Sequence, residues 1–274
     1  MKFCRTCGRK LMDEERCPVC YQRRMQSQEM WQSYQYYPGQ YRTKKKFLPM
    51  VIAAVAVLVG IILIIKLATG GKDGIPKFNA RNYDETGTCG EDAQWGYKEA
   101  AGELTIIGTG EMEDYYYKEA PWRDLAIQSI KIYGVTTIGD YTFYGCEYLR
   151  SITIPHGVTS IGEHAFSECT SLESVAIPDS VMTIEEYAFN GCERLKTVTI
   201  PDGMTMIDEG VFSDCSSLES ITIPDSVRYV GTCAFTSSDN LRNIYYSGTE
   251  EQWKSIGSGL YNGKFFRTNV HYNS

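Results

Sequence analysis

The chain has 274 residues, of which 43% are hydrophobic and 22% charged, a composition typical of a folded protein with one large or two modest domains. Its formal net charge of −7 is unevenly divided, because residues 1–69 carry 12 Lys/Arg against 4 Asp/Glu and residues 70–274 carry 15 against 30. The resulting charges of +8 and −15 indicate two halves that lie in different surroundings.

The first 20 residues contain two Cys-x-x-Cys pairs separated by nine residues, formed by Cys4, Cys7, Cys17 and Cys20. This spacing is typical of a tetrahedral thiolate site and predicts a zinc ribbon over residues 1–20. A redox pair is the less favoured alternative, since neither pair begins a helix of a βαβ unit. A segment this short cannot fold on its core alone, so structural zinc would supply the folding free energy. The ribbon resembles those at the N-termini of many bacterial membrane proteins.

Several Arg and Lys residues make the ribbon basic, which raises nucleic acid as a partner. The ribbon lacks the interleaved aromatic residues that base stacking needs, and a basic segment beside a membrane also suits anionic lipid. Nucleic-acid binding is therefore not expected. Residues 21–46, rich in Gln, Tyr and Ser, follow neither a helical nor a strand period and predict a disordered basic linker.

Phe47–Ile65 is a run of 19 uncharged residues and predicts a transmembrane helix over residues 47–67. As a helix the run reaches about 28 Å, close to the thickness of a bilayer core. A cleaved signal peptide is less favoured because 46 residues precede the run, and a buried core helix would show a polar face. Lys44–Lys46 flank its N-terminal side, so the positive-inside rule places the N-terminus in the cytoplasm and the C-terminal domain outside the cell.

Residues 68–78 are expected to be an external linker, and residues 79–128 a β-rich N-terminal cap. Gln94–Tyr97 and Leu104–Ile107 have the pattern of strands separated by glycine turns. A cap is needed there because the residues that follow are repetitive, and the first unit of a repeat stack would otherwise expose its apolar face.

A step of 23 residues governs the next part of the chain. Ile-Pro recurs at Ile154, Ile177, Ile200 and Ile223. Columns of Phe (Phe143, Phe166, Phe189, Phe212, Phe235), Leu (Leu149, Leu172, Leu195, Leu218, Leu241) and Cys (Cys146, Cys169, Cys192, Cys215) keep the same step. Such a period predicts a solenoid over residues 129–246, with an atypical C-terminal cap over residues 247–274.

The sequence of each repeat predicts three short secondary-structure elements. A first strand such as Ser174–Ile177 alternates, with Val175 and Ile177 inward, and ends at proline, which cannot donate to a sheet. A second strand is expected at Met182–Ile184. The Glu-Glu-Tyr-Ala-Phe segment then predicts a single helical turn, with acidic residues at its positive end.

The pattern Leu-x-x-Ile/Val-x-Ile-Pro-x-x-Val-x-x-Ile-Gly-x-x-Ala-Phe-x-x-Cys, with the leading Thr88-Cys89-Gly90 and Ala120-Pro121-Trp122, resembles the BspA-like leucine-rich repeat family of bacterial surface proteins. The resemblance covers about 190 of the 274 residues. It implies an α+β, β-dominated leucine-rich-repeat solenoid with 23-residue coils, exposed on the cell surface, in a family associated with adhesion and protein binding. It names no ligand.

The outward positions of the first strands form a candidate ligand surface. These positions are mostly small and hydroxylated: Ser151, Thr153, Ser174, Thr197, Thr199, Ser220, Thr222, Asn243 and Tyr245. A flat polar surface of this kind can accept a protein strand or a glycan. The alternative is that Ser and Thr simply suit exposed strands, and the scarcity of aromatic or arginine anchors argues against a high-affinity centre.

Three further columns have structural interpretations. Arg150, Glu173, Lys196, Glu219 and Arg242 alternate in sign and predict an ion ladder between coils. The acidic columns Asp140, Glu163, Glu186, Glu209 and Asp179, Asp202, Asp225 raise calcium as an alternative to their ordinary roles at helix starts and turns. The repeat cysteines are expected to be buried thiols, whereas Cys89 and Cys233 have no assigned partner.

The sequence does not predict an enzyme, since His156, His164 and His271 have no recognisable nucleophile partner and no phosphate-binding loop is present. The favoured function is a membrane-anchored, extracellular leucine-rich-repeat protein that binds a protein or glycan in adhesion or surface recognition. The alternative is an envelope structural or regulatory protein whose zinc ribbon engages a cytoplasmic partner.

The predicted topology is tested by adding protease to intact cells that carry a tag at each end of the chain. The C-terminal tag and residues 79–274 should be degraded, while the N-terminal tag survives until the membrane is permeabilised. The measurement is an immunoblot for both tags before and after permeabilisation. Equal survival of both tags on intact cells would contradict a single span at residues 47–67.

Overall fold

The structure, a computed structural model, describes residues 2–3, 10–11, 74–117, 119–263 and 265–272. The chain divides into two compact units, residues 1–64 and residues 65–274. In the first unit, β1 (Lys2–Phe3) pairs antiparallel with β2 (Lys10–Leu11). Cys4, Cys7, Cys17 and Cys20 lie outside the described residues, as do the predicted linker 21–46 and transmembrane helix 47–67. In the part of the chain that the structure describes, no helix has the length and apolarity of a membrane span.

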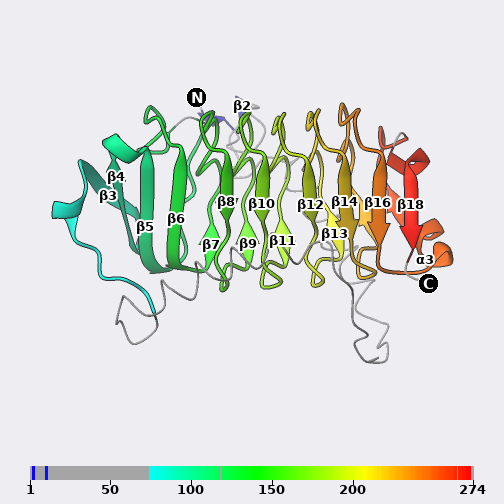
Figure 1. The fold of residues 1–274 in the computed structure, drawn as a ribbon, viewed down its shortest axis with the longest axis horizontal. Helices are drawn as coiled ribbons and strands as arrows, with labels where there is room; N and C mark the ends of the chain where they lie inside the picture. Colours follow the sequence, from blue (N-terminus) through cyan, green and yellow to red (C-terminus); the bar gives the residue numbers. More distant parts are fainter. Residues whose placement is uncertain (1, 4–9, 12–73, 118, 264, 273–274) are drawn as a thin grey trace. The chain divides into compact units, whose positions relative to one another are not determined.

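The second unit is a β-dominated solenoid in which each coil contributes short parallel strands (Figure 1). The larger sheet has six strands in the order β18-β16-β14-β12-β10-β8. Their bounds are β8 Ser151–Thr153, β10 Ser174–Ala176, β12 Thr197–Thr199, β14 Ser220–Ile223, β16 Asn243–Tyr246 and β18 Asn269–Tyr272. Ser174 is in register with Ser151 and with Thr197, so the 23-residue step of the sequence is the register of the sheet.

The second strands of the coils form two three-stranded parallel sheets. One contains β7 Thr137–Ile138, β9 Ser160–Ile161 and β11 Thr183–Ile184, and the other contains β13 Met206–Ile207, β15 Tyr229–Val230 and β17 Gly257–Ser258. The strand expected at Met182–Ile184 is therefore present, one residue shorter than predicted.

A four-stranded sheet lies at the N-terminal end of the coils. Its strands are β3 Glu85–Gly90, β4 Asp92–Lys98, β5 Glu103–Gly110 and β6 Ser129–Val135, with 3-10 turns η1 Ala80–Asn82 and η2 Glu99–Ala101. β3, β4 and β5 are antiparallel, and β5 pairs parallel with β6. The pairing changes from antiparallel to parallel where the non-repetitive segment meets the first coil.

The C-terminal segment after residue 246 is not only a cap. Helix α3 (Glu250–Lys254) begins at a capping box between Thr249 and Gln252, and η3 (Phe265–Arg267) precedes β18. β18 pairs parallel with β16 along its whole length, so this segment adds a further rung to the six-stranded sheet.

The prediction of a single helical turn in each coil is wrong. Glu186–Gly191 and the equivalent segments form consecutive hydrogen-bonded turns, not a turn of helix. Two positions per coil have left-handed backbone. The first holds Tyr141, His164, Tyr187, Gly210 and Cys233, and the second holds Gly145, Glu168, Gly191, Asp214 and Ser237. Backbone N–H groups here donate to the following coil, for example Tyr187 N to Glu209 O at 2.9 Å and Phe189 N to Val211 O at 3.0 Å. Pairing between coils replaces the pairing within a helix, and no helix dipole meets the acidic residues.

A column of buried aromatic rings runs through the coils. Phe143, Phe166, Phe189, Phe212 and Phe235 stack with centroids 5.2 to 5.7 Å apart. Trp122 extends the column at one end, 5.9 Å from Phe143, and Phe265 extends it at the other, 4.3 Å from Phe235. Both end coils are therefore covered by an aromatic ring that continues the stack.

The repeat cysteines are buried free thiols, which confirms the prediction. The Sγ atoms of Cys169, Cys192 and Cys215 donate to the carbonyl oxygens of Phe143, Phe166 and Phe189 at 3.2 to 3.3 Å. Burial raises the pKa of these thiols above their ordinary value, which keeps them protonated. Cys89 is buried and Cys233 half-buried, and neither forms a disulfide.

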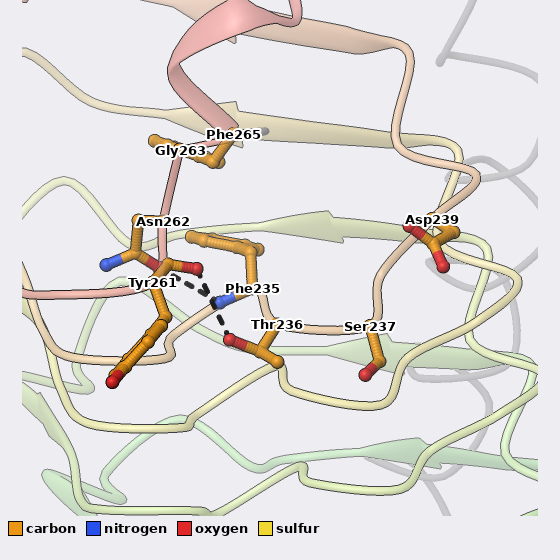
Figure 2. Close-up of a pocket in the computed structure, with 8 residues that line it drawn as sticks. All are labelled: Phe235, Thr236, Ser237, Asp239, Tyr261, Asn262, Gly263 and Phe265. Atoms are coloured by element: carbon orange, nitrogen blue, oxygen red, sulfur yellow. Dashed lines mark hydrogen bonds between the residues drawn. The ribbon is translucent and has the colours of Figure 1, made fainter.

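Asn262 completes the hydrogen bonds of the last Phe position (Figure 2). Phe212 N donates to Ala234 O at 2.9 Å, as in the inner coils, but Phe235 N donates to the Asn262 side chain, Oδ1, at 3.4 Å. The Asn262 Nδ2 group donates in turn to Gly231 O at 2.5 Å. The side chain, 3% exposed, thus stands in for the next coil.

Replacing Asn262 by alanine should lower the free energy of unfolding by about 1–3 kcal/mol. Phe235 N would be left buried without a partner, and Gly231 O would keep only the long hydrogen bond from Ala234 N at 3.4 Å. Asn82→Ala, at an exposed position outside the coils, is the control and should change it by less than about 0.5 kcal/mol. Equilibrium urea denaturation of the purified protein measures both. Equal losses in the two variants would contradict a capping role for Asn262.

Candidate functional site

The structure brings all nine residues of the predicted ligand surface onto one face of the six-stranded sheet. We call the outward positions of β8, β10, β12, β14, β16 and β18 the polar strand face; it comprises Ser151, Thr153, Ser174, Ala176, Thr197, Thr199, Ser220, Thr222, Asn243, Tyr245, Asn269 and His271. The alternate residues Ile152, Val198 and Ile221 are buried, whereas Val175 is half-buried against the core. The role of this face in binding remains a prediction.

The polar strand face is regular and uncharged along its length. Ser and Thr hydroxyls recur at the spacing of neighbouring strands, about 4.8 Å. Side chains of this size lose little conformational freedom when a ligand covers them. The face can therefore offer a repeated set of hydroxyl donors and acceptors to an extended ligand.

The ion ladder predicted beside this face is wrong. Arg150, Glu173, Lys196, Glu219 and Arg242 are all exposed. The ion pairs found among the described residues lie elsewhere, as between Lys131 and Glu103 at 2.7 Å. Neighbouring members of the column are joined by their backbones instead, for example Glu173 N to Arg150 O at 2.8 Å. Solvated side chains gain too little from exposed pairing to be held together.

An aromatic pair ends the polar strand face at its C-terminal side. The rings of Tyr245 and His271 stack at 4.9 Å with an interplanar angle of 19°, and Tyr245 is 47% exposed. His271 Nε2 lies 3.0 Å from Asn243 Oδ1. The sequence prediction omitted His271 because its register partner Tyr245 is 26 residues away, outside the 23-residue step. The alternating Asn269–Tyr272 segment was the signal that could have revealed it.

The described residues show no catalytic arrangement. The hollow drawn in Figure 2, of about 300 Å³, is lined by Thr236, Ser237, Asp239 and Tyr261 beside the Asn262 cap, with no histidine among its lining residues. His164 and His271 contact Glu163 and Asn243, and no hydrogen bond joins a histidine to a serine or cysteine within the described ranges. This hollow therefore belongs to the end of the solenoid.

The acidic column Asp140, Glu163, Glu186 and Glu209 brings carboxylates close together. Asp140 Oδ1 accepts from Glu163 N at 2.7 Å. Burial, followed by repulsion from Glu186 and Asp140, raises the pKa of Glu163 to about 8. Over the residues that the structure describes, no three His, Cys, Asp or Glu side chains are arranged to hold a metal ion, so the calcium hypothesis finds no site.

The raised pKa of Glu163 predicts a pH-dependent stability. In the folded protein Glu163 keeps its proton up to about pH 8, whereas in the unfolded chain it loses the proton above about pH 4.5. The stabilisation by this proton is therefore complete below pH 4.5 and is lost as the pH rises through 8. Burial lowers the pKa of His164 to about 4, and this shift makes the stability rise with pH between 4 and 6.5. Between pH 6.5 and 8.5, stability should therefore fall in the wild-type protein.

Glu163→Gln isolates this effect, because glutamine does not titrate. At pH 8.5 the variant should exceed the wild type in free energy of unfolding by about 1 kcal/mol, and the difference should shrink at pH 6.5. Denaturation midpoints at both pH values measure it, with the exposed Glu173→Gln as control. A difference that is the same at both pH values would contradict the raised pKa.

Comparison with known proteins gives one family and several similar structures. The model of the BspA type leucine rich repeat region matches in six copies over residues 124–264. A leucine-rich repeat protein from Eubacterium ventriosum is 30% identical with a TM-score of 0.54, over 60% of this chain and 44% of that chain. A leucine rich cell surface protein from Faecalibacterium prausnitzii is 32% identical with a TM-score of 0.47, over 63% of this chain and 43% of that chain. Comparison with curated proteins gives no match.

The match to this chain thus spans less than half the length of either of these two proteins. The family model, in contrast, matches just over half of this chain, and its six copies fall on the stacked coils described above. The 23-residue step, the parallel register and the buried Phe and Cys columns lie within the matched region. The chain therefore belongs to the BspA-type leucine-rich repeat family.

Proposed function

We propose that this protein is a non-enzymatic surface-recognition protein that binds an extended protein segment or glycan through its polar strand face. The observation that carries this proposal is the common register of the face across six strands. A ligand with regularly spaced polar groups can contact several coils at once. Each contact is weak, but contacts on one rigid support add without further ordering of the protein.

The C-terminal end of the face supports the same proposal. Most of its positions carry small side chains, which exclude water poorly and rarely dominate binding energy. The stacked Tyr245 and His271, with Asn243 beside them, supply an aromatic anchor with hydrogen-bonding groups. We expect the ligand to be held most strongly there and to extend along the Ser and Thr positions.

A location outside the cell is part of the proposal. The protein from Faecalibacterium prausnitzii is described as a cell surface protein, and the repeat pattern resembles that of BspA-like bacterial surface proteins. The apolar run of residues 47–67, with Lys44–Lys46 before it, supports a single-pass anchor in the cell membrane with the N-terminus in the cytoplasm. The solenoid would then face the outside of the cell.

The alternative function places the working site in the zinc ribbon. The antiparallel pairing of β1 with β2 joins the two ends of the segment that contains Cys4 and Cys7, as a metal-binding knuckle requires. Structural zinc held by Cys4, Cys7, Cys17 and Cys20 would order the ribbon, and its basic surface would engage a cytoplasmic partner. Under this alternative the solenoid is a passive envelope domain.

The polar strand face is tested on the full-length protein with protein and glycan arrays. Once a ligand is found, Thr199→Arg should weaken its binding at least about tenfold, because a long charged side chain would cover the middle of the face. Thr183→Arg, at an exposed threonine of β11 in the other sheet, is the matched control and should change binding less than about twofold.

Two results would contradict the proposal: the absence of any ligand on either array, or equal losses in the two variants. Retained ligand binding by Thr199→Arg, with an unchanged unfolding midpoint, would place the binding site elsewhere on the solenoid.

A further inference from the structure

A second surface of the solenoid carries clustered aromatic rings. We call it the aromatic patch; it comprises Tyr116, Tyr117, Tyr141, Tyr144, His164 and Tyr187. Tyr141, His164 and Tyr187 occupy the left-handed position of the turns that follow β7, β9 and β11. None of the six residues belongs to the six-stranded sheet, so the patch is separate from the polar strand face.

The rings of the patch contact one another across coils. His164 lies between Tyr141 and Tyr187, with centroid distances of 4.8 and 5.1 Å. Tyr117 packs edge-on against Tyr144 at 4.9 Å. The next position of the column is Gly210, where a Cβ atom would collide with the Tyr187 ring, so the ring lies flat over the following coil. The patch is therefore a continuous set of rings in contact across neighbouring coils.

The outer rings are open to solvent. Tyr116 and Tyr117 are each 46% exposed, although both contact Tyr141. Single exposed apolar side chains are common on proteins, but contiguous exposed aromatic groups mark interaction surfaces. The core of the solenoid does not require these two side chains, which lie outside its buried cluster.

Carboxylates surround the rings. Asp114 Oδ1 accepts from Asp140 N at 3.0 Å, and Asp140 Oδ1 accepts from Glu163 N at 2.7 Å, so the carboxylates of Asp114 and Asp140 lie beside Tyr141, whereas Glu163 keeps its proton below about pH 8. Tyr187 donates its hydroxyl to Glu209 Oε1 at 2.9 Å. Glu168 lies close enough to Tyr144 to raise the pKa of its hydroxyl, after burial and Tyr117. The rings and the carboxylates thus form one surface.

We propose that the aromatic patch binds a cationic segment of a partner protein, with lysine or arginine side chains packed over Tyr116 and Tyr117 and paired with the neighbouring carboxylates. Charge complementarity decides the class of partner. A neutral glycan or an apolar segment would remove water from the carboxylates without replacing it by a counter-charge, which is unfavourable. An anionic partner would be repelled. The cation of a lysine or arginine side chain can pack over the rings and also pair with the carboxylates.

The experiment uses the purified full-length protein and three fluorescent peptides of equal length, in which alternate positions are arginine, glutamine or glutamate. Fluorescence anisotropy should show binding of the arginine peptide that weakens as salt rises from 0.05 to 0.5 M, and no binding of the other two. Equal binding of the glutamine peptide would overturn the cationic specificity.

Variants separate the patch from the net charge of the protein. The double variant Tyr116→Ser, Tyr117→Ser keeps every charge of the protein. It should weaken binding of the arginine peptide about 5- to 20-fold, which is the effect of losing two ring contacts. Tyr148→Ser, which removes a tyrosine that is 61% exposed outside the patch, is the matched control and should bind as the wild type does.

A second pair of variants tests the carboxylates. Glu168 lies beside Tyr144, whereas Asp179 is an exposed turn residue outside the patch. Glu168→Gln should therefore weaken binding of the arginine peptide more than Asp179→Asn does, although each variant removes one negative charge. Unfolding midpoints confirm that each variant is folded. Wild-type affinity in the double tyrosine variant, or equal losses for the two charge variants, would show general electrostatic attraction and overturn the proposal.

Discussion

The solenoid depends on the hydrogen bonds that each coil makes with its neighbours at the Phe position. Phe189 N donates to Val211 O of the next coil, and Phe189 O accepts from the thiol of Cys215. A coil with one residue more or less would leave the buried Phe189 N without a partner and Phe189 O with only the hydrogen bond from Cys192 N at 3.4 Å, at a cost larger than a modest loss of apolar contact. The 23-residue step is therefore set by buried polar groups together with the apolar columns.

The same constraint explains how the two ends differ from the middle. Ser238 takes the place of a repeat cysteine and donates to Phe212 O at 2.7 Å. Asn262 supplies the acceptor that the next coil would have supplied. At the opposite end Trp122 stacks on Phe143 and donates its Nε1 to Thr142 O at 2.8 Å. Each substitution at an end preserves the hydrogen bond or the ring contact, although it changes the residue.

Columns of identical residues were predictable from the sequence because each one has the same environment in every coil. The Phe, Leu and Cys columns and the outward Ser and Thr positions are of this kind. The prediction of a helical turn was wrong because hydrogen bonds to the next coil override the local preference for helix at Glu185–Phe189. The Tyr245–His271 pair and the Tyr117–Tyr144 contact were missed because they join residues outside the 23-residue step, so only the folded chain places them together. Tyr141, His164 and Tyr187 do keep the step, but the column they form is not made of one residue type and was not recognised.

The constraint also decides where recognition can lie. Inward positions are fixed by the core, and turn backbones are fixed by pairing between coils, which leaves outward strand side chains and the side chains of the left-handed turn positions free to vary. On most strands these side chains are small and neutral, with an aromatic pair at the C-terminal end only, whereas on the turns of the first coils they are aromatic beside carboxylates. Two surfaces of opposite chemistry thus stand on one rigid support. A partner that recognises one of them has no chemical reason to recognise the other, so the two proposed binding activities are independent.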